Sequence, residues 1–164
     1  MQSGMGRSGH FFAVDAHDIQ PDLLTSAKAL GGGIPCGAIL CNEDIAADFG
    51  PGSLGTTFGG GPVAAAAINA VIDAIDSEHL LQNVTDREAQ IREQCIVGPV
   101  KRIQGMGLLL GLVCDRPAAD VRDALLELGI LTGTSSDPDV LRILAPLVLQ
   151  SEHVDRLARA LDTI

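Results

Sequence analysis

Short apolar stretches and one long run of helix-forming residues alternate along the first half of the chain. Residues 23–24 and 37–41 are apolar and bounded by turn residues, which is typical of buried strands in an α/β core. From Pro62, the run VAAAAINAVIDAI predicts a long helix, because proline suits a first helical turn and alanine favours helix. Apolar positions on one side of residues 78–95 predict that the helix continues after a bend near Ser77.

The second half predicts a smaller sheet covered by helices. Residues 100–114 are expected to form two strands joined at Gly105-Met106-Gly107, and residues 117–128 form an amphipathic helix closed by Gly129. Further strands are expected at 130–132 and 140–144, and Ser151 is expected to cap a last helix. The predicted fold class is α/β, with a glycine-rich part over residues 1–75, a connecting helix over 76–96 and a small α+β domain over 97–164.

Composition narrows the classes of function. The 164 residues are 46% hydrophobic and carry a formal charge of −10 that is spread along the chain, so binding to nucleic acid or a membrane is not expected. No apolar run approaches the roughly 20 residues that cross a bilayer, and the N-terminus lacks the pattern of a secretory signal, which favours a cytoplasmic location. The four cysteines contain no CxxC pair and are interpreted as reduced core thiols rather than a metal site.

Lys28 is the first candidate for chemistry. It is one of two lysines and lies in TSAKALGGG among small neutral residues, with no acid within five positions. A lysine amine in apolar surroundings is neutral often enough to attack a carbonyl carbon and form a Schiff base. The alternative is a surface lysine on a short helix, which the local sequence does not exclude.

Three motifs occur in a fixed order: QSGMGRSG, then PDLLTSAKALGGGIPCGAI, then GTTFGGGPVAAAA. Together they resemble the class III pyridoxal-phosphate-dependent aminotransferases, and within that class the acetylornithine aminotransferases most. RIQGMGLLLGL and VLRILAPL extend the resemblance towards the C-terminus. It implies the C-terminal part of a fold-type I transferase, in which the end of a large α/β domain is followed by a small α+β domain.

The resemblance also implies roles for four residues. Lys28 would bind pyridoxal 5'-phosphate as a Schiff base and then move a proton between the substrate Cα and the cofactor C4′. Gln2 would lie beside the cofactor ring. Thr57 would hydrogen-bond the cofactor phosphate of a neighbouring subunit, which implies a homodimer with shared active sites; a turn or helix cap is its alternative role. Arg142 would bind a substrate carboxylate or pair with a glutamate of the same chain, unless it is a surface arginine on an edge strand.

The implied reaction transfers an amino group from N-acetylornithine, or a similar ω-amino compound, to 2-oxoglutarate. The substrates are therefore small amino acids and 2-oxo acids.

The family's aspartate that pairs with the cofactor ring nitrogen, and its phosphate-binding cup, correspond to positions upstream of the first residue, and Gly61 stands where the family has asparagine. The alternative is an incomplete, inactive module for folding or dimerisation that needs an N-terminal half. A dinucleotide-binding loop at GMGRSG is not favoured, because no predicted strand precedes it.

Overall fold

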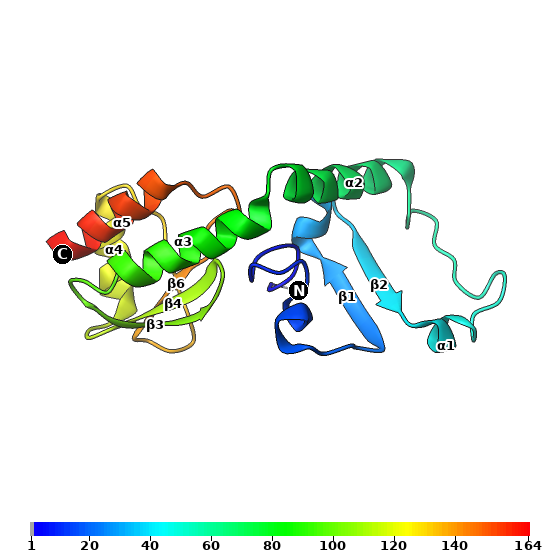
Figure 1. Ribbon diagram of the computed structural model, residues 1–164, viewed down its shortest axis with the longest axis horizontal. Coiled ribbons are helices and arrows are strands. Elements are labelled where there is room, and N and C mark those ends of the chain that lie inside the picture. Colours follow the sequence, from blue (N-terminus) through cyan, green and yellow to red (C-terminus); the bar gives the residue numbers. More distant parts are fainter. Residues whose placement is uncertain (1) are drawn as a thin grey trace.

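The computed structural model describes residues 2–164, which fold into two lobes joined by two consecutive helices (Figure 1). The first lobe contains 3-10 helix η1 (Ala13–His17), strand β1 (Leu23–Ala27), 3-10 helix η2 (Lys28–Gly31), strand β2 (Gly37–Cys41), and helices α1 (Glu43–Ala46) and α2 (Pro62–Ser77). The second contains helix α3 (Leu80–Gln94), strands β3 (Val100–Met106) and β4 (Leu109–Cys114), helix α4 (Ala118–Glu127), strands β5 (Gly133–Thr134) and β6 (Val140–Ile143), and helix α5 (Ser151–Thr163).

The predicted bend between the two long helices is confirmed. Helix α2 begins at Pro62, as expected, and ends at Ser77. His79 then adopts a left-handed backbone with φ of +52°, and α3 starts at the next residue. Because the bend redirects the chain, α3 packs into the second lobe, where Val84 and Ile91 are fully buried.

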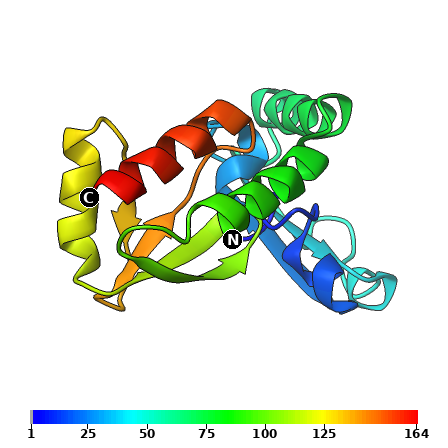
Figure 2. The same ribbon diagram turned by 60° about the vertical axis from the view of Figure 1, so that its left-hand side comes forward.

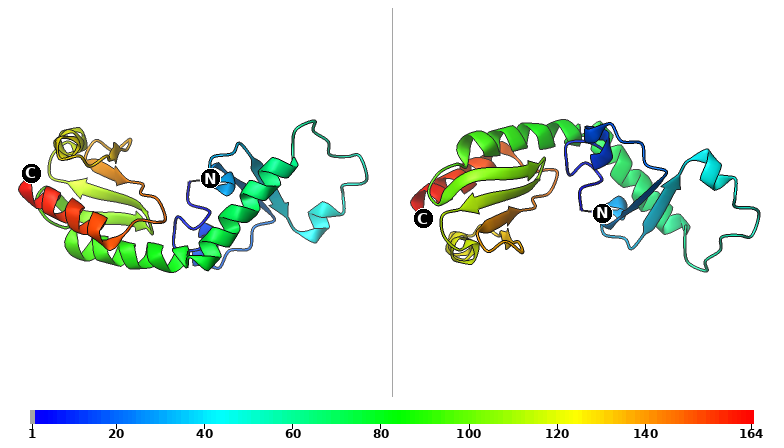
Figure 3. Two further views of the ribbon diagram at one scale, coloured as in Figure 1. Left: turned by 90° about the horizontal axis from the view of Figure 1, so that it is seen from above. Right: turned by 90° about the horizontal axis from the view of Figure 1, so that it is seen from below.

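The second lobe is built on an antiparallel four-stranded sheet with strand order β3-β4-β6-β5. Helices α3 and α5 lie side by side against it, and α4 packs next to β5 and β6 (Figures 2 and 3). Strand β4 alternates between buried and half-buried positions, with Leu110 and Leu112 in the core. The two strands predicted within residues 100–114 are therefore confirmed as a hairpin.

The strand predicted at residues 130–132 is wrong. Gly129 has φ of +72°, and the Ile130 backbone N–H donates to the Leu125 carbonyl at 2.9 Å, so these residues still complete the C-terminal cap of α4. Sheet pairing starts only at Gly133.

The cap of the last helix also differs from the prediction. Helix α5 starts at Ser151, and its cap is the preceding residue, Gln150, whose N–H donates to His153 Nδ1 at 3.1 Å.

The first lobe also differs from the prediction of buried strands. Strands β1 and β2 form an antiparallel two-stranded sheet in which Ile39 is 72% exposed and Leu23 is 55% exposed. A small core beneath it joins Met5 and Leu30 to Ile75 of α2. An apolar strand sequence indicates that the strand needs other residues packed against its faces. It does not show whether residues 2–164 provide those residues.

The cysteines are all free, and they divide between core and surface. Cys95 and Cys114 are buried, Cys36 is half-buried, and Cys41 is exposed, so the interpretation of all four as core thiols is wrong for Cys41. Within residues 2–164 no three potential metal-binding side chains come together. No helix in the same range is long and apolar enough to cross a membrane.

Burial raises the pKa of the Cys95 thiol from its ordinary value of 9.0 to about 11. The folded state therefore favours the protonated thiol, and this stabilisation is complete below pH 9 and is lost as the pH rises through 11. We expect the free energy of unfolding to fall by roughly 1–2 kcal/mol over this range. Burial also raises the pKa of the Cys114 thiol, which therefore contributes to the pH dependence in the same direction.

Urea unfolding at several pH values measures this effect. A Cys95→Ala variant is expected to lose a substantial part of the pH dependence and to keep the part due to Cys114, whereas Cys41→Ala, which removes an exposed thiol, is expected to keep all of it. An unchanged slope in the Cys95 variant would contradict the assignment.

Candidate functional site

Lys28 lies directly after β1, where the strand passes into η2. Its backbone has φ of +58°, a left-handed conformation that residues with a side chain rarely adopt. The turn is completed by Gly32, whose φ is +59°. Backbone strain of this kind costs about 1–3 kcal/mol and is concentrated at functional sites.

The Lys28 side chain is exposed, so residues 2–164 do not enclose it in the apolar pocket expected from the sequence. No carboxylate within the same range reaches salt-bridge distance of its amine. Lys101, by contrast, lies 2.8 Å from Asp115 Oδ2 and donates to the Gly98 carbonyl at 3.4 Å. Of the two lysines, Lys28 is the one whose amine has no acidic partner among the described residues.

Gln2 is exposed and belongs to the glycine-rich segment that opens the chain. In Figures 1 and 3 this segment starts near the end of β1, where Lys28 follows. Gln2 and Lys28 are thus contributed by two segments that the first lobe brings close together.

Thr57 is exposed in the connection between α1 and α2. The turn hydrogen bond there is made by its neighbour, since the Gly59 N–H donates to Thr56 Oγ1 at 3.3 Å. The cap of α2 is Gly61, which has no capping side chain. Neither alternative role therefore falls to Thr57. The connection extends away from the end of β1 (Figure 1), so the segment that carries Thr57 lies apart from the segment that carries Lys28.

Arg142 lies on β6 opposite Gly133 of β5, where its side chain is exposed. Its guanidinium covers that glycine: a Cβ built on Gly133 would lie 3.2 Å from Arg142 Nη2. Strand β6 pairs with both β4 and β5, so Arg142 is not on an edge strand. Within residues 2–164 no salt bridge occupies it, which leaves its fork of N–H donors available for a carboxylate.

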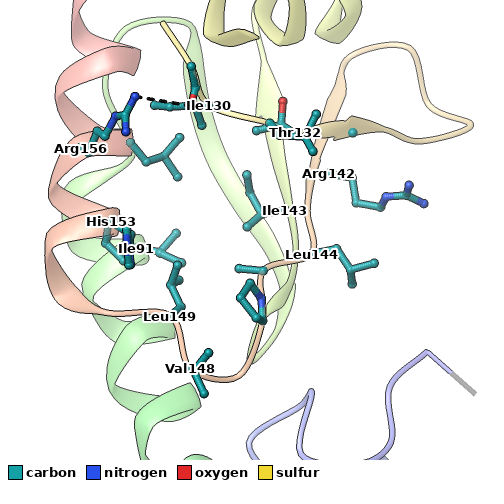
Figure 4. Close-up of a pocket in the computed structure, with 17 residues that line it drawn as sticks. Ile91, Ile130, Thr132, Arg142, Ile143, Leu144, Val148, Leu149, His153 and Arg156 are labelled. Carbon is teal, nitrogen blue, oxygen red and sulfur yellow. Dashed lines mark hydrogen bonds between the residues drawn. The ribbon is translucent and has the colours of Figure 1, made fainter. Parts of the chain in front are cut away.

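A pocket of about 670 Å³ lies beside Arg142 in the second lobe. Its lining is mostly apolar and includes Ile130, Leu144 and Val148; Figure 4 shows Arg142 pointing away from its centre. Arg156 also lines it but donates to the Leu128 carbonyl at 2.9 Å. Neither Lys28, Gln2 nor Thr57 borders this pocket, so it is separate from the residues expected to hold the cofactor.

The junction between the lobes was missed by sequence reasoning. Arg7, from the first motif, donates to the Ala145 carbonyl, and its own carbonyl accepts from the Leu108 N–H at 2.9 Å. Both contacts join segments more than 100 residues apart. The only signal in the sequence was that GMGRSG and RIQGMG both belong to the resemblance, and nothing local links them.

The fold and the lysine at the end of β1 define a class of protein. The family model described as aminotransferase class-III matches residues 1–164, and the chain belongs to this family. The chain is 43% identical to acetylornithine aminotransferase 1 of Bordetella bronchiseptica over 98% of its own length. It covers 42% of the length of that relative.

Solved structures agree with this assignment. The acetylornithine aminotransferase of Elizabethkingia anophelis superposes with a TM-score of 0.87 at 28% identity, over 99% of this chain and 45% of that one. The ornithine aminotransferase of Toxoplasma gondii, which is described with partial occupancy of pyridoxal phosphate at its active site, gives 0.86 at 29% identity, over 99% and 40%. The predicted class and the predicted partial transferase fold are therefore confirmed.

Proposed function

We propose that the protein containing this chain transfers an amino group from N-acetylornithine, or a similar ω-amino compound, to 2-oxoglutarate, with pyridoxal phosphate held by Lys28. The observation that carries the proposal is the Lys28 amine itself, which is exposed and has no acidic partner among residues 2–164. It lies on a strained left-handed backbone in a member of the class III aminotransferase family.

The residues of this chain suit that cofactor in distinct ways. When bound, pyridoxal phosphate supplies a ring that withdraws electrons from the substrate Cα. The Lys28 amine would hold the cofactor through its aldehyde, and as the free amine it would carry the proton taken from the substrate Cα. Gln2 would lie beside the ring, and the Thr57 hydroxyl would donate to a phosphate oxygen. Arg142 would hold a substrate carboxylate through two parallel N–H donors.

We further propose a homodimer in which Thr57 serves the cofactor of the partner copy. The connection that carries Thr57 extends away from Lys28 in its own chain. Two large apolar side chains beside it are open to solvent: Phe58 is 93% exposed and Leu54 is 74% exposed. Exposed apolar clusters of this kind are typical of subunit interfaces.

The second candidate function is that of an incomplete module for folding or dimerisation, without catalysis of its own. The coverage favours it as a property of the chain alone, since residues 1–164 span 42% of the Bordetella enzyme. The two proposals differ in whether these residues turn over substrate unaided.

Glutamate formation from N-acetylornithine and 2-oxoglutarate tests both. We expect negligible turnover by residues 1–164 with pyridoxal phosphate, and recovery when the polypeptide corresponding to the remaining length of the relatives is supplied. Robust turnover by the 164 residues alone would contradict the module. An absence of turnover in the completed protein, with the cofactor attached to Lys28, would contradict the transferase.

A further inference from the structure

The glycine-rich opening segment is seated against the second lobe by its backbone. The Arg7 carbonyl accepts from the Leu108 N–H at 2.9 Å, in the turn between β3 and β4. Gly107 lies so close that a Cβ built on it would be 2.3 Å from the Arg7 carbonyl oxygen. Ser8, the next residue along, is only 6% exposed. The segment that starts with Gln2 thus lies in direct contact with this turn.

Side chains of α3 hydrogen-bond to the turn itself. Glu88 Oε2 accepts from the Gly107 N–H at 2.6 Å, while Glu88 Oε1 accepts from Arg92 Nη2 at 2.8 Å. Arg92 Nη2 also donates to the Gly105 carbonyl at 2.7 Å. A carboxylate and a guanidinium therefore hold both ends of the turn that contacts Arg7.

The Arg7 side chain reaches in another direction, to the segment that follows β6. Its guanidinium donates to the carbonyl of Ala145, three residues after Arg142. That segment is anchored further on by Asn83, whose Nδ2 donates to the carbonyls of Leu147 at 2.6 Å and Leu149 at 3.0 Å. Arg7 thus connects the segment carrying Gln2 with the segment leading from Arg142.

The surroundings of Arg7 suit a connecting role. Burial lowers the pKa of its guanidinium, and within residues 2–164 no carboxylate forms a salt bridge with it. Ion pairing within the described residues therefore does not account for the position of the Arg7 side chain. The only hydrogen-bond acceptor found for this guanidinium among the described residues is a backbone carbonyl of the other lobe.

We propose that Arg7 is a positioning residue: by joining the opening segment to the Ala145 carbonyl, it sets the separation between Arg142 and the cofactor site at Lys28. The inference rests on the proposed function, because it concerns how the substrate carboxylate is placed relative to the reacting atoms. Misplacement of a substrate group by about 1 Å can cost a large factor in rate.

The test compares Arg7→Met, which keeps the apolar stem, with Arg7→Gln, which keeps a donor for the carbonyl. Arg122→Met is the matched control, since Arg122 is partly exposed and its only salt bridge among residues 2–164 is with its neighbour Asp123 at 2.8 Å. Kinetics use the completed protein, and hydrogen exchange at the Leu108 amide is measured on the same samples. For Arg7→Met we expect faster Leu108 exchange and a KM for 2-oxoglutarate raised by about tenfold or more.

Cofactor attachment at Lys28 should stay unchanged in all three variants, and Arg7→Gln should recover part of the loss. Parallel loss of cofactor attachment and substrate affinity in Arg7→Met, without recovery in Arg7→Gln, would indicate a merely structural residue and overturn the proposal. So would an unchanged KM or unchanged Leu108 exchange. Hydrogen exchange at Leu108 reports the contact between the lobes whether or not the protein transaminates. A failure of the proposed function is recognised separately, because the wild-type completed protein would then show no turnover.

Discussion

Replacement of Lys28 by alanine is expected to abolish covalent attachment of pyridoxal phosphate and to lower turnover in the completed protein by roughly 10³-fold or more. The exposed Lys28 amine has no acidic partner among residues 2–164, so it is free to bond to the aldehyde. Alanine removes the amine that we propose both holds the cofactor and moves the proton. Borohydride reduction followed by mass spectrometry of peptides measures the attachment.

Lys101→Ala is the matched control, because it removes the other lysine of the chain. Its amine lies 2.8 Å from Asp115 Oδ2 and is held as an ion pair, so we expect full labelling in this variant. A label found on Lys101, or one retained by the Lys28 variant, would disprove the assignment of Lys28.

The same variant also tests whether the site is shared between two copies. Completed protein with Lys28→Ala is mixed, after unfolding and refolding, with completed protein carrying Thr57→Val. If each site combines Lys28 of one copy with Thr57 of the other, the mixture is expected to regain about a quarter of the wild-type activity, because half of the dimers are mixed and each has one intact site. Thr56→Val by itself should keep wild-type activity, since among residues 2–164 the Thr56 hydroxyl accepts a hydrogen bond from the Gly59 N–H and makes no other. No gain on mixing would rule out the shared site.

Gly107→Ala is expected to lower the free energy of unfolding by roughly 2–4 kcal/mol. Gly107 has φ of +58°, which costs alanine about 1–2 kcal/mol. Its added Cβ would also lie 2.3 Å from the Arg7 carbonyl oxygen, so the opening segment must shift and its contact with the β3–β4 turn weakens. Urea unfolding of the chain measures the change.

Gly60→Ala separates the two causes. Gly60 has nearly the same backbone, with φ of +66°, but a Cβ there meets nothing within 4 Å. Only the backbone cost remains, so we expect a loss of about 1 kcal/mol. Equal losses for the two variants would show that Gly107 is required for its backbone alone and not for the close approach of Arg7.

The local elements were largely predictable, because their causes are local. Pro62 and the alanine-rich run that follows it fix where α2 begins, and the glycines around Met106 mark the turn of the β3–β4 hairpin. The strand expected at 130–132 failed for a reason that spacing cannot show. The Ile130 amide still caps α4, and this competing hydrogen bond uses the group that a strand would need.

The candidate residues divide in the same way. By itself the sequence determined the class, through three ordered motifs, and with it the choice of Lys28, Gln2, Thr57 and Arg142. Only the tertiary structure decided that Lys28 is exposed on a left-handed backbone, and that Thr56 rather than Thr57 makes the turn. It alone revealed the contacts of Arg7 with Leu108 and Ala145. Those bonds end on backbone groups, which every residue carries, so no pattern of side chains along the chain encodes their partners.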